Sequence, residues 1–271
     1  MFKIFGPQDE VLQSVPFIQD EVQYTLIHTI TCSEDAICYK SQDGLVIYAQ
    51  TPGYRAWIWM SDKLREAERE SRLLELCDVL PDTPIPGIAG DPNVVALFSA
   101  LYAAKHHISH QPRMELQAYQ CPNVVNPEGV VGELQVASAR DLLEVARFLV
   151  EFTYDAYGKT VELSSQLQDA DRLIGSGNLY VWKVDGTPVS MANIASRTPR
   201  HARINAVCTP LAHRKKGYAS ALVAQVCRII LEEGRTPILY ADGANPDSNR
   251  VYQHIGFRVS GRIREIDFIR E

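Results

Sequence analysis

The chain contains 271 residues and has a formal net charge of −6 at pH 7. This acidic balance argues against a broad nucleic-acid-binding surface, and no apolar stretch approaches membrane-spanning length. The first residues also lack the basic and apolar regions of a secretory signal, so we expect a cytoplasmic protein that binds neither nucleic acid nor membrane. The length predicts two domains or one duplicated unit.

Apolar periodicity and turn residues predict alternating helices and strands in the first half. Two strands between Ile37 and Gln50 are joined by a turn at Asp43 and Gly44. The other predicted elements are a helix from Val22 to Ile30, a strand from Trp57 to Met60, a charged helix from Ser61 to about Leu80, a loop from Pro81 to Pro92, a helix from Val94 to His107 and a strand from Met114 to Tyr119. This alternation is typical of an α/β domain.

A stretch with two prolines and two glycines, Pro122 to Gly132, is the predicted linker between the halves. We therefore predict an N-terminal α/β domain over residues 1–125 and a C-terminal domain over residues 133–271. The strand–Asp-Gly–strand pattern of the first half recurs between Leu179 and Ser196, which either duplication or chance similarity explains. The helix predicted at Ser61 has an acidic start without glycine. Negative charge at a helix start would repel a phosphate group, so we predict that the first half binds no phosphate and is non-catalytic.

Six cysteines are spread through the chain without a CxxC pair or zinc-ligand spacing. Cys208 and Cys227 fall on core-like positions, so we expect buried reduced thiols there. His106, His107 and His110 are close in sequence, but adjacent histidines at a helix end point apart, and surface placement is favoured. We predict no metal site.

The most informative stretch lies in the second half, where a strand from Ile204 to Cys208 leads through Thr209 and Pro210 to a basic loop. This loop, Arg214-Lys215-Lys216-Gly217-Tyr218-Ala219, precedes an amphipathic helix. Free backbone N–H groups and the helix dipole at such a start favour an anion, and Gly217 lets the backbone approach a phosphate closely. Taken alone, the loop is also compatible with an exposed basic turn.

A second predicted strand leads to a short helix with a polar face. Asn245 is in position to cap this helix, and Pro246 suits its first turn. Ser248, Asn249 and Tyr252 lie three, four and seven residues after the capping asparagine, so all four side chains share one face. The alternative is an ordinary solvated face, but a loop and a helix in this order, one strand apart, favour a binding site.

These residues resemble two motifs of the GNAT N-acyltransferase superfamily. Val207-Cys208-Thr209-Pro210, followed by Arg214-x-x-Gly217-x-Ala219, resembles its acetyl-coenzyme A loop, and Asn245-Pro246-x-Ser248-Asn249-x-x-Tyr252-x-x-Ile255-Gly256-Phe257 resembles its downstream coenzyme-binding helix. The resemblance covers about residues 133–268 and implies the GNAT fold, an α/β fold with a mixed sheet, in the second half. Together with Ser190-Met191, the motifs are similar to a bacterial two-part subgroup whose N-terminal half is a degenerate copy of the same fold.

The resemblance also implies a role for each part of the second half. The strand from Ala206 to Cys208 would pair with the pantetheine arm, the loop amides from Lys215 to Ser220 would hold the pyrophosphate, and Tyr252 would stand near the sulfur. The implied coenzyme-binding residues are Ala206, Val207, Cys208, Thr209, Arg214, Lys215, Lys216, Gly217, Tyr218, Ala219, Ser220, Asn245, Ser248, Asn249 and Tyr252.

Acyl transfer to an amine needs an unprotonated amine, a donor for the oxyanion and a proton for the departing thiolate. Tyr252 is the candidate proton donor, because a phenol with a pKa of about 10 matches the basicity of a thiolate, and the backbone N–H of Cys208 is the candidate oxyanion donor. The general base is not evident, because the strand offers Asn205 where many superfamily members have a glutamate. The other candidate bases are Asp242, His201 and His213, although each of these residues is more typical of a structural role. A chain of water molecules could accept the proton instead.

Two functions remain open at this point. The first is an enzyme that transfers an acetyl group from acetyl-coenzyme A to a primary amine of a small molecule or peptide. A homodimer is compatible with this function. The second is an acyl-coenzyme A-binding sensor or structural module without turnover. Tyr252 favours the enzyme, whereas the lack of an evident base leaves the binding module open.

Overall fold

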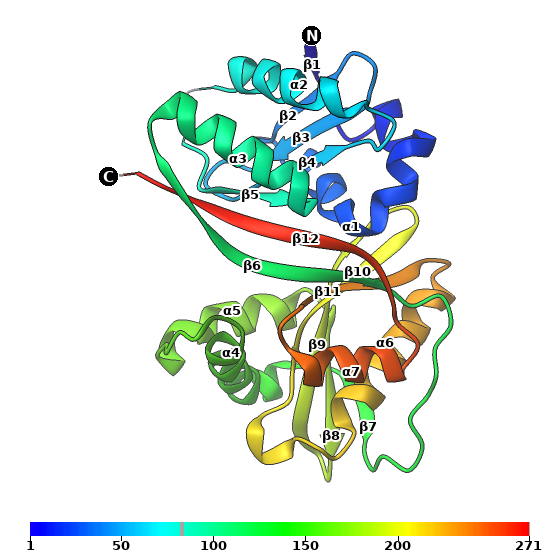
Figure 1. Ribbon diagram of the computed structural model, residues 1–271. Coiled ribbons are helices and arrows are strands. Elements are labelled where there is room, and N and C mark those ends of the chain that lie inside the picture. Colours follow the sequence, from blue (N-terminus) through cyan, green and yellow to red (C-terminus); the bar gives the residue numbers. More distant parts are fainter. Residues whose placement is uncertain (82–83, 271) are drawn as a thin grey trace. The chain divides into compact units, whose positions relative to one another are not determined.

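Helices and strands alternate along the whole computed structural model, which describes residues 1–81 and 84–270 (Figure 1). The first of its two units comprises Met1–Tyr119, Tyr240–Asn245 and the chain from Val259 onward, and the second comprises Gln120–Leu239 and Pro246–Arg258. The predicted α/β class is confirmed. None of the helices in the described ranges combines the length and apolar character that a membrane crossing requires.

The C-terminal strand belongs to the first unit, whereas the predicted division places all of residues 133–271 in the second domain. β12 (Arg258–Ile269) pairs antiparallel with β5 (Gly87–Gly90), and Ile266 lies opposite Ile88. Composition and linker signals assign each continuous stretch to one domain, so they do not detect a strand that returns to an earlier unit.

The first unit is built on a mixed sheet with the strand order β1-β2-β3-β4-β5-β12-β6. Strands β4 and β5 are parallel, whereas the pairs β1–β2, β2–β3, β3–β4 and β5–β12 are antiparallel. The other elements of this unit are β1 (Phe2–Ile4), η1 (Glu10–Gln13), α1 (Val15–Thr31), β2 (Ile37–Ser41), β3 (Val46–Gln50), β4 (Ala56–Met60), α2 (Glu66–Val79), α3 (Pro92–His106) and β6 (Ser109–Gln120).

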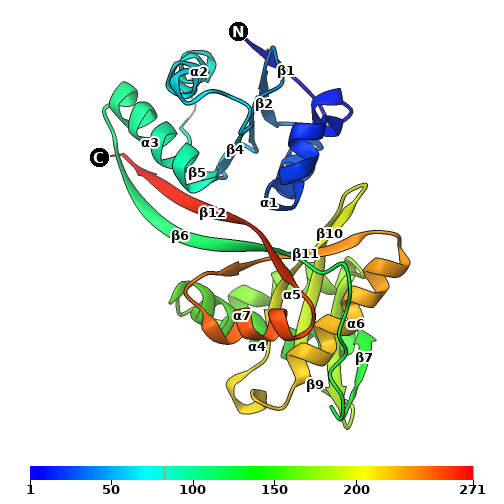
Figure 2. The ribbon, with the colours of Figure 1, turned by 45° about the vertical axis from the view of Figure 1, so that its right-hand side comes forward.

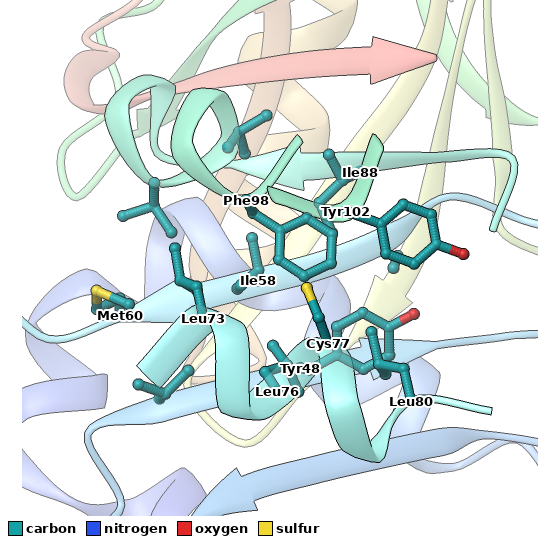
Figure 3. Packing of buried hydrophobic residues seen from close by; sticks show 14 of the residues in the cluster. Tyr48, Ile58, Met60, Leu73, Leu76, Cys77, Leu80, Ile88, Phe98 and Tyr102 are labelled. Carbon is teal, nitrogen blue, oxygen red and sulfur yellow. The ribbon is translucent and has the colours of Figure 1, made fainter. Parts of the chain in front are cut away.

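The core of the first unit lies between this sheet and helices α2 and α3 (Figure 3). Tyr48, Ile58, Leu73, Leu76 and Phe98 are fully buried in it. Burial of one such side chain stabilises a fold by about 1.5–3 kcal/mol. The first unit is therefore stabilised by contacts among its own elements.

Four predictions for the first half are wrong in detail. Helix α1 begins at Val15 rather than Val22, and β6 begins at Ser109 rather than Met114. Helix α2 begins at Glu66 rather than Ser61, because the Leu64 N–H donates to the Ser61 carbonyl at 3.2 Å and closes a turn before the helix. The predicted loop from Pro81 to Pro92 contains β5, a short strand that is buried throughout and whose two glycines resemble loop sequence. Residues 82 and 83 of that loop lie outside the described residues.

The second unit has the strand order β7-β8-β9-β10-β11, with β10 parallel to β11 and the other neighbouring pairs antiparallel. Helices α4 and α5 pack on one face of its central strands, and α6 packs on the other face (Figure 2). The elements are β7 (Glu133–Val136), η2 (Ala139–Asp141), α4 (Leu142–Tyr157), α5 (Leu163–Gly175), β8 (Leu179–Val184), β9 (Thr187–Arg197), β10 (His201–Cys208), η3 (Leu211–His213), α6 (Tyr218–Glu232), β11 (Thr236–Asp242, its last residues in the first unit) and α7 (Pro246–His254).

The two halves of the chain repeat one order of elements: a strand, a helical segment, three strands, a helix, a strand, a helix and a strand. In each half the last of the three central strands is parallel to the strand after the next helix, as β4 is to β5 and β10 is to β11. The repetition extends the strand–turn–strand echo of the sequence to the whole of each half.

The predicted linker is a packed part of the second unit rather than a free tether. The Val125 N–H donates to the Ile255 carbonyl, and the Trp182 indole N–H donates to the Val131 carbonyl, each at 3.0 Å. Just after α7, Gly256 has a φ of 103°, and a Cβ atom there would overlap the carbonyl oxygen of Asn123. The end of α7 is thus held against the linker.

Gly256→Ala should lower the free energy of unfolding by at least about 2 kcal/mol more than Gly177→Ala does. Both glycines have positive φ, 103° and 68°, but a Cβ atom at Gly177 meets no other atom within 4 Å. Only the first variant adds a backbone collision to the conformational strain. Chemical denaturation of the two variants measures the difference, and equal losses would contradict the close contact between α7 and the linker.

Candidate functional site

Strand β10 contains a bulge next to the predicted loop. Asn205 lies opposite Asn193 of β9 and Cys208 lies opposite Met191, so β10 spans three steps where β9 spans two. The extra residue bends the strand and interrupts its ladder, and Ala206 at this point has a left-handed φ of 48°. The bulge is where the sequence predicts contact with the pantetheine arm, and the Ala206 and Val207 side chains are only half-buried there.

The basic loop after β10 ends in a left-handed turn that starts α6. Lys215 and Gly217 have φ values of 62° and 81°, and Gly217 occupies the N-cap position. A Cβ atom at Gly217 would stand 2.9 Å from the Val130 Cγ2 atom, so both the backbone conformation and the space favour glycine.

The first turn of α6 has the properties of an anion-binding helix start. The Ala221 N–H donates to the Gly217 carbonyl at 3.0 Å, so the N–H groups of Tyr218, Ala219 and Ser220 precede the helical ladder. These three residues are half-exposed, and the turn contains no acidic residue. In the part of the chain that the structure describes, no side chain caps this helix. Its dipole and open amides are therefore available to a phosphate.

The predicted cation Arg214 shapes the loop through its side chain. Its Nε–H donates to the Thr209 carbonyl at 2.8 Å, and its guanidinium pairs with Asp155 of α4. One turn away on α4, Glu151 Oε2 accepts a hydrogen bond of 3.1 Å from the Leu211 N–H. Two α4 carboxylates thus hold the segment that leads into the left-handed turn. The exposed positive charges nearest the helix start are those of Lys215 and Lys216.

Cys208 is a buried thiol at the end of β10. Its side chain is 4% exposed and its thiol donates to the Phe148 carbonyl at 3.4 Å. Burial, assisted by the nearby Glu151 and Asp155 carboxylates, raises the pKa of this thiol to about 12. The carbonyl of Cys208 accepts a 3.0 Å hydrogen bond from the Ser190 hydroxyl. The buried reduced thiol predicted here is confirmed.

Helix α7 begins at Pro246, directly after Asn245, as the sequence predicts. Along its polar face the side chains become progressively buried, since Ser248 is half-exposed whereas Asn249 and Tyr252 are 9% and 8% exposed. α7 packs against α6 in the second unit. The two helices that carry the predicted coenzyme motifs are therefore in contact.

The tyrosine on this helix has a defined packing environment. The Tyr252 ring meets the Phe257 ring edge to face, with centroids 5.8 Å apart and an angle of 67° between the planes. The Phe257 N–H donates to the Tyr252 carbonyl at 3.0 Å and closes the helix end. Packing therefore fixes the ring and leaves the hydroxyl as the polar end of a mostly buried side chain.

Beside the bulge, two asparagine side chains lie where the family resemblance predicts a glutamate. The Asn193 Nδ2–H donates to Asn205 Oδ1 at 2.9 Å, and Asn193 is 5% exposed. Of the alternative bases, Asp242 Oδ1 accepts from the Ala244 N–H at 2.8 Å, and His201, the first residue of β10, is 8% exposed. The remaining candidate, His213, ends the short helix η3 and is half-exposed.

Three side chains around the site are absent from the sequence-based set: Glu151, Asp155 and Asn193. The carboxylates lie on the polar face of α4, about 60 positions before their loop partners, and no local pattern marks them. Asn193 is recognisable only through the β9–β10 register, which places it opposite Asn205. Within residues 1–81 and 84–270, no group of three or more histidine, cysteine or carboxylate side chains is arranged to hold a metal ion.

The start of α2, the helix in the first half that corresponds to α6, has the opposite character. Its N-cap is Arg65, with an ordinary negative φ of −62°, and its first turn carries Glu66 and Glu68. Two carboxylates there repel a phosphate. The helix start predicted at Ser61 is wrong by five residues, but the observed start is likewise acidic and free of glycine.

Comparison with known proteins agrees with this description. Residues 184–265, from the end of β8 into β12, match the family model described as FR47-like protein. A search of curated proteins found no match to the sequence.

Solved structures resemble the chain over its whole length. An acetyltransferase of the GNAT family from Colwellia psychrerythraea is 13% identical, with 99% of this chain and 100% of that chain covered and a TM-score of 0.59. A GCN5-related N-acetyltransferase from Sphaerobacter thermophilus is 14% identical, with 100% and 96% covered and a TM-score of 0.60. A Drosophila protein is 13% identical, with 99% and 98% covered and a TM-score of 0.66. Residues 184–265 are thus similar to the FR47-like family, and the chain has the fold of these solved structures.

At pH 8, iodoacetamide should label the exposed Cys32 and leave Cys208 unlabelled in the folded protein. The thiolate is the reactive form, and a thiol with a pKa of about 12 is ionised only as the pH approaches that value. Peptide mass mapping after timed labelling checks this. Labelling of both cysteines at similar rates, with an unchanged circular dichroism spectrum, would contradict the buried site.

Proposed function

We propose that the second unit is an N-acetyltransferase that transfers the acetyl group of acetyl-coenzyme A to a primary amine. The observation that carries this proposal is the start of α6, where the left-handed turn at Gly217 leaves three amides open beside the bulged end of β10. A pyrophosphate matches this group of open amides and flanking lysines in charge and in hydrogen-bond acceptors.

The residues around the bulge would divide the chemistry among them. Bound acetyl-coenzyme A would supply an activated thioester. The backbone N–H of Cys208 would donate to the thioester oxygen as negative charge develops there, and the Tyr252 hydroxyl would give its proton to the sulfur that departs. Asn205 is a carboxamide and takes up no proton, so the attacking amine would lose its proton to solvent or to a water molecule at the site.

The direct test is release of free thiol from acetyl-coenzyme A in the presence of a panel of primary amines, with a matching mass increase of the amine by one acetyl group. Thiol release with at least one amine, above the rate without amine, is the expected result. Absence of release with every amine, despite binding of coenzyme A, would contradict the enzyme.

The second candidate function is a coenzyme-binding sensor without turnover. The Asn193–Asn205 pair favours it, because two carboxamides stand where a carboxylate would act as base. This alternative predicts that coenzyme A binds at the α6 start and that no amine releases thiol. The amine panel therefore separates the two functions.

Ser220→Glu should weaken coenzyme A binding at least tenfold without lowering the melting temperature. A carboxylate in the first turn interacts favourably with the helix dipole, by about 0.3–1 kcal/mol, but it repels a pyrophosphate that is held by the same amides. Gln225→Glu, a half-buried position further along α6, adds the same charge away from the helix start. Calorimetric titration of both variants provides the comparison. Equal affinities would contradict this location of the coenzyme site.

Tyr252→Phe should lower kcat by roughly tenfold to ten-thousandfold, the range for removal of a general acid. The ring contact with Phe257 is kept in this variant, so the affinity for coenzyme A should change little. If Tyr252 has only a structural role, the variant will instead lose thermal stability while turnover stays near normal. Kinetics and melting temperature measured on one preparation distinguish these outcomes.

A further inference from the structure

Helix α4 carries a surface hollow directly beside the segment that leads into the left-handed turn. Its cavity volume is about 300 Å³, at the lower end of the range for sites that hold small molecules. We call it the α4 hollow, and its walls are formed mainly by Val150, Glu151, Tyr154 and Asp155 of α4 and by Leu211 and Arg214 from the segment after β10.

The walls of the α4 hollow include exposed apolar side chains. Tyr154 and Leu211 are 61% and 75% exposed, and Val150 also lines the hollow. Two large, neighbouring apolar side chains at such exposure contribute little to the core. An exposed apolar surface in a concavity is a feature of binding sites.

The charge of the hollow selects the sign of its ligand. Arg214 and Asp155 form an ion pair, so their charges offset each other. Glu151 then leaves the hollow with a net negative charge. One of its carboxylate oxygens accepts the Leu211 N–H at 3.1 Å, and an ionised carboxylate has further acceptor capacity. A cation with an apolar body therefore complements the hollow in both charge and surface.

We propose that the α4 hollow binds the acceptor as a small organic cation, with its ammonium group against Glu151 and its apolar part on Tyr154 and Leu211. This inference rests on the proposed function and narrows its acceptor to amines that bear an apolar substituent. The carboxylate favours the protonated amine that predominates in neutral solution. The hollow thus captures the ammonium form, and loss of its proton follows before attack. Arg214 belongs both to the hollow and to the loop before α6, so the acceptor is captured next to the predicted coenzyme site.

The test is calorimetric titration of the full chain, without coenzyme, with three probes. Phenethylamine carries a cation and an aromatic body, phenethyl alcohol carries the body alone, and methylamine carries the cation alone. We expect phenethylamine to bind at least tenfold more tightly than either of the other probes. No binding of phenethylamine, or equal binding of phenethyl alcohol, would overturn the proposal.

Three variants assign the binding to the hollow. Glu151→Gln keeps an acceptor for the Leu211 N–H and so keeps the segment in place, but removes the charge, and it should weaken phenethylamine binding at least tenfold. Tyr154→Ala should weaken it through loss of the exposed ring. Glu144→Gln, on the same helix but paired with Arg147 outside the hollow, is the matched control and should leave the affinity unchanged. Wild-type affinity in Glu151→Gln would overturn the assignment.

Turnover measurements keep this inference separable from the proposed function. Thiol release with amines whose KM is the same in wild type and in Glu151→Gln would support the acetyltransferase and overturn the hollow as its acceptor site. Conversely, phenethylamine binding that depends on Glu151, without thiol release, would support the hollow as a cation site and contradict the acetyltransferase.

Discussion

The candidate site depends on one backbone constraint, the left-handed turn at Gly217 that starts α6 with its first amides unused. A side chain at this position would press on Val130 and would sit at a strained φ of 81°. The turn is supported from α4, where Asp155 pairs with Arg214 and Glu151 accepts the Leu211 N–H. With the turn in place, the helix dipole, the open amides and the flanking lysines act on the same point. The bulge lies in the strand that leads into this turn, and α7 packs against α6.

The two halves of the chain differ in the chemistry of one corresponding helix start. Both halves run through the same order of elements and both contain a parallel strand pair before and after the corresponding helix. In the first half that helix starts with Arg65 in an ordinary conformation and with Glu66 and Glu68 in its first turn. Fold similarity alone therefore assigns no function to the first unit. The chemistry of the helix start restricts the proposed coenzyme site to the second.

The sequence predicted the elements whose signals are local. The helical period after Tyr218, the glycine at the N-cap and the proline at the start of α7 each act within a few residues, and the structure has these elements at the predicted places. The failures involve distant contacts. Strand β5 is short and buried on both faces, so it lacks alternation, and β12 pairs with it from the other end of the chain. The carboxylates of α4 acquire their roles from partners about 60 residues away.

Hydrogen–deuterium exchange with and without saturating acetyl-coenzyme A tests the central claim most directly, because it reports on the amides that are proposed to bind the pyrophosphate. The account predicts slower exchange in peptides that cover residues 209–221 in the presence of the ligand, and unchanged exchange in peptides that cover residues 61–73 at the start of α2. Protection at residues 61–73, or unchanged exchange at residues 209–221 under saturation, would contradict it.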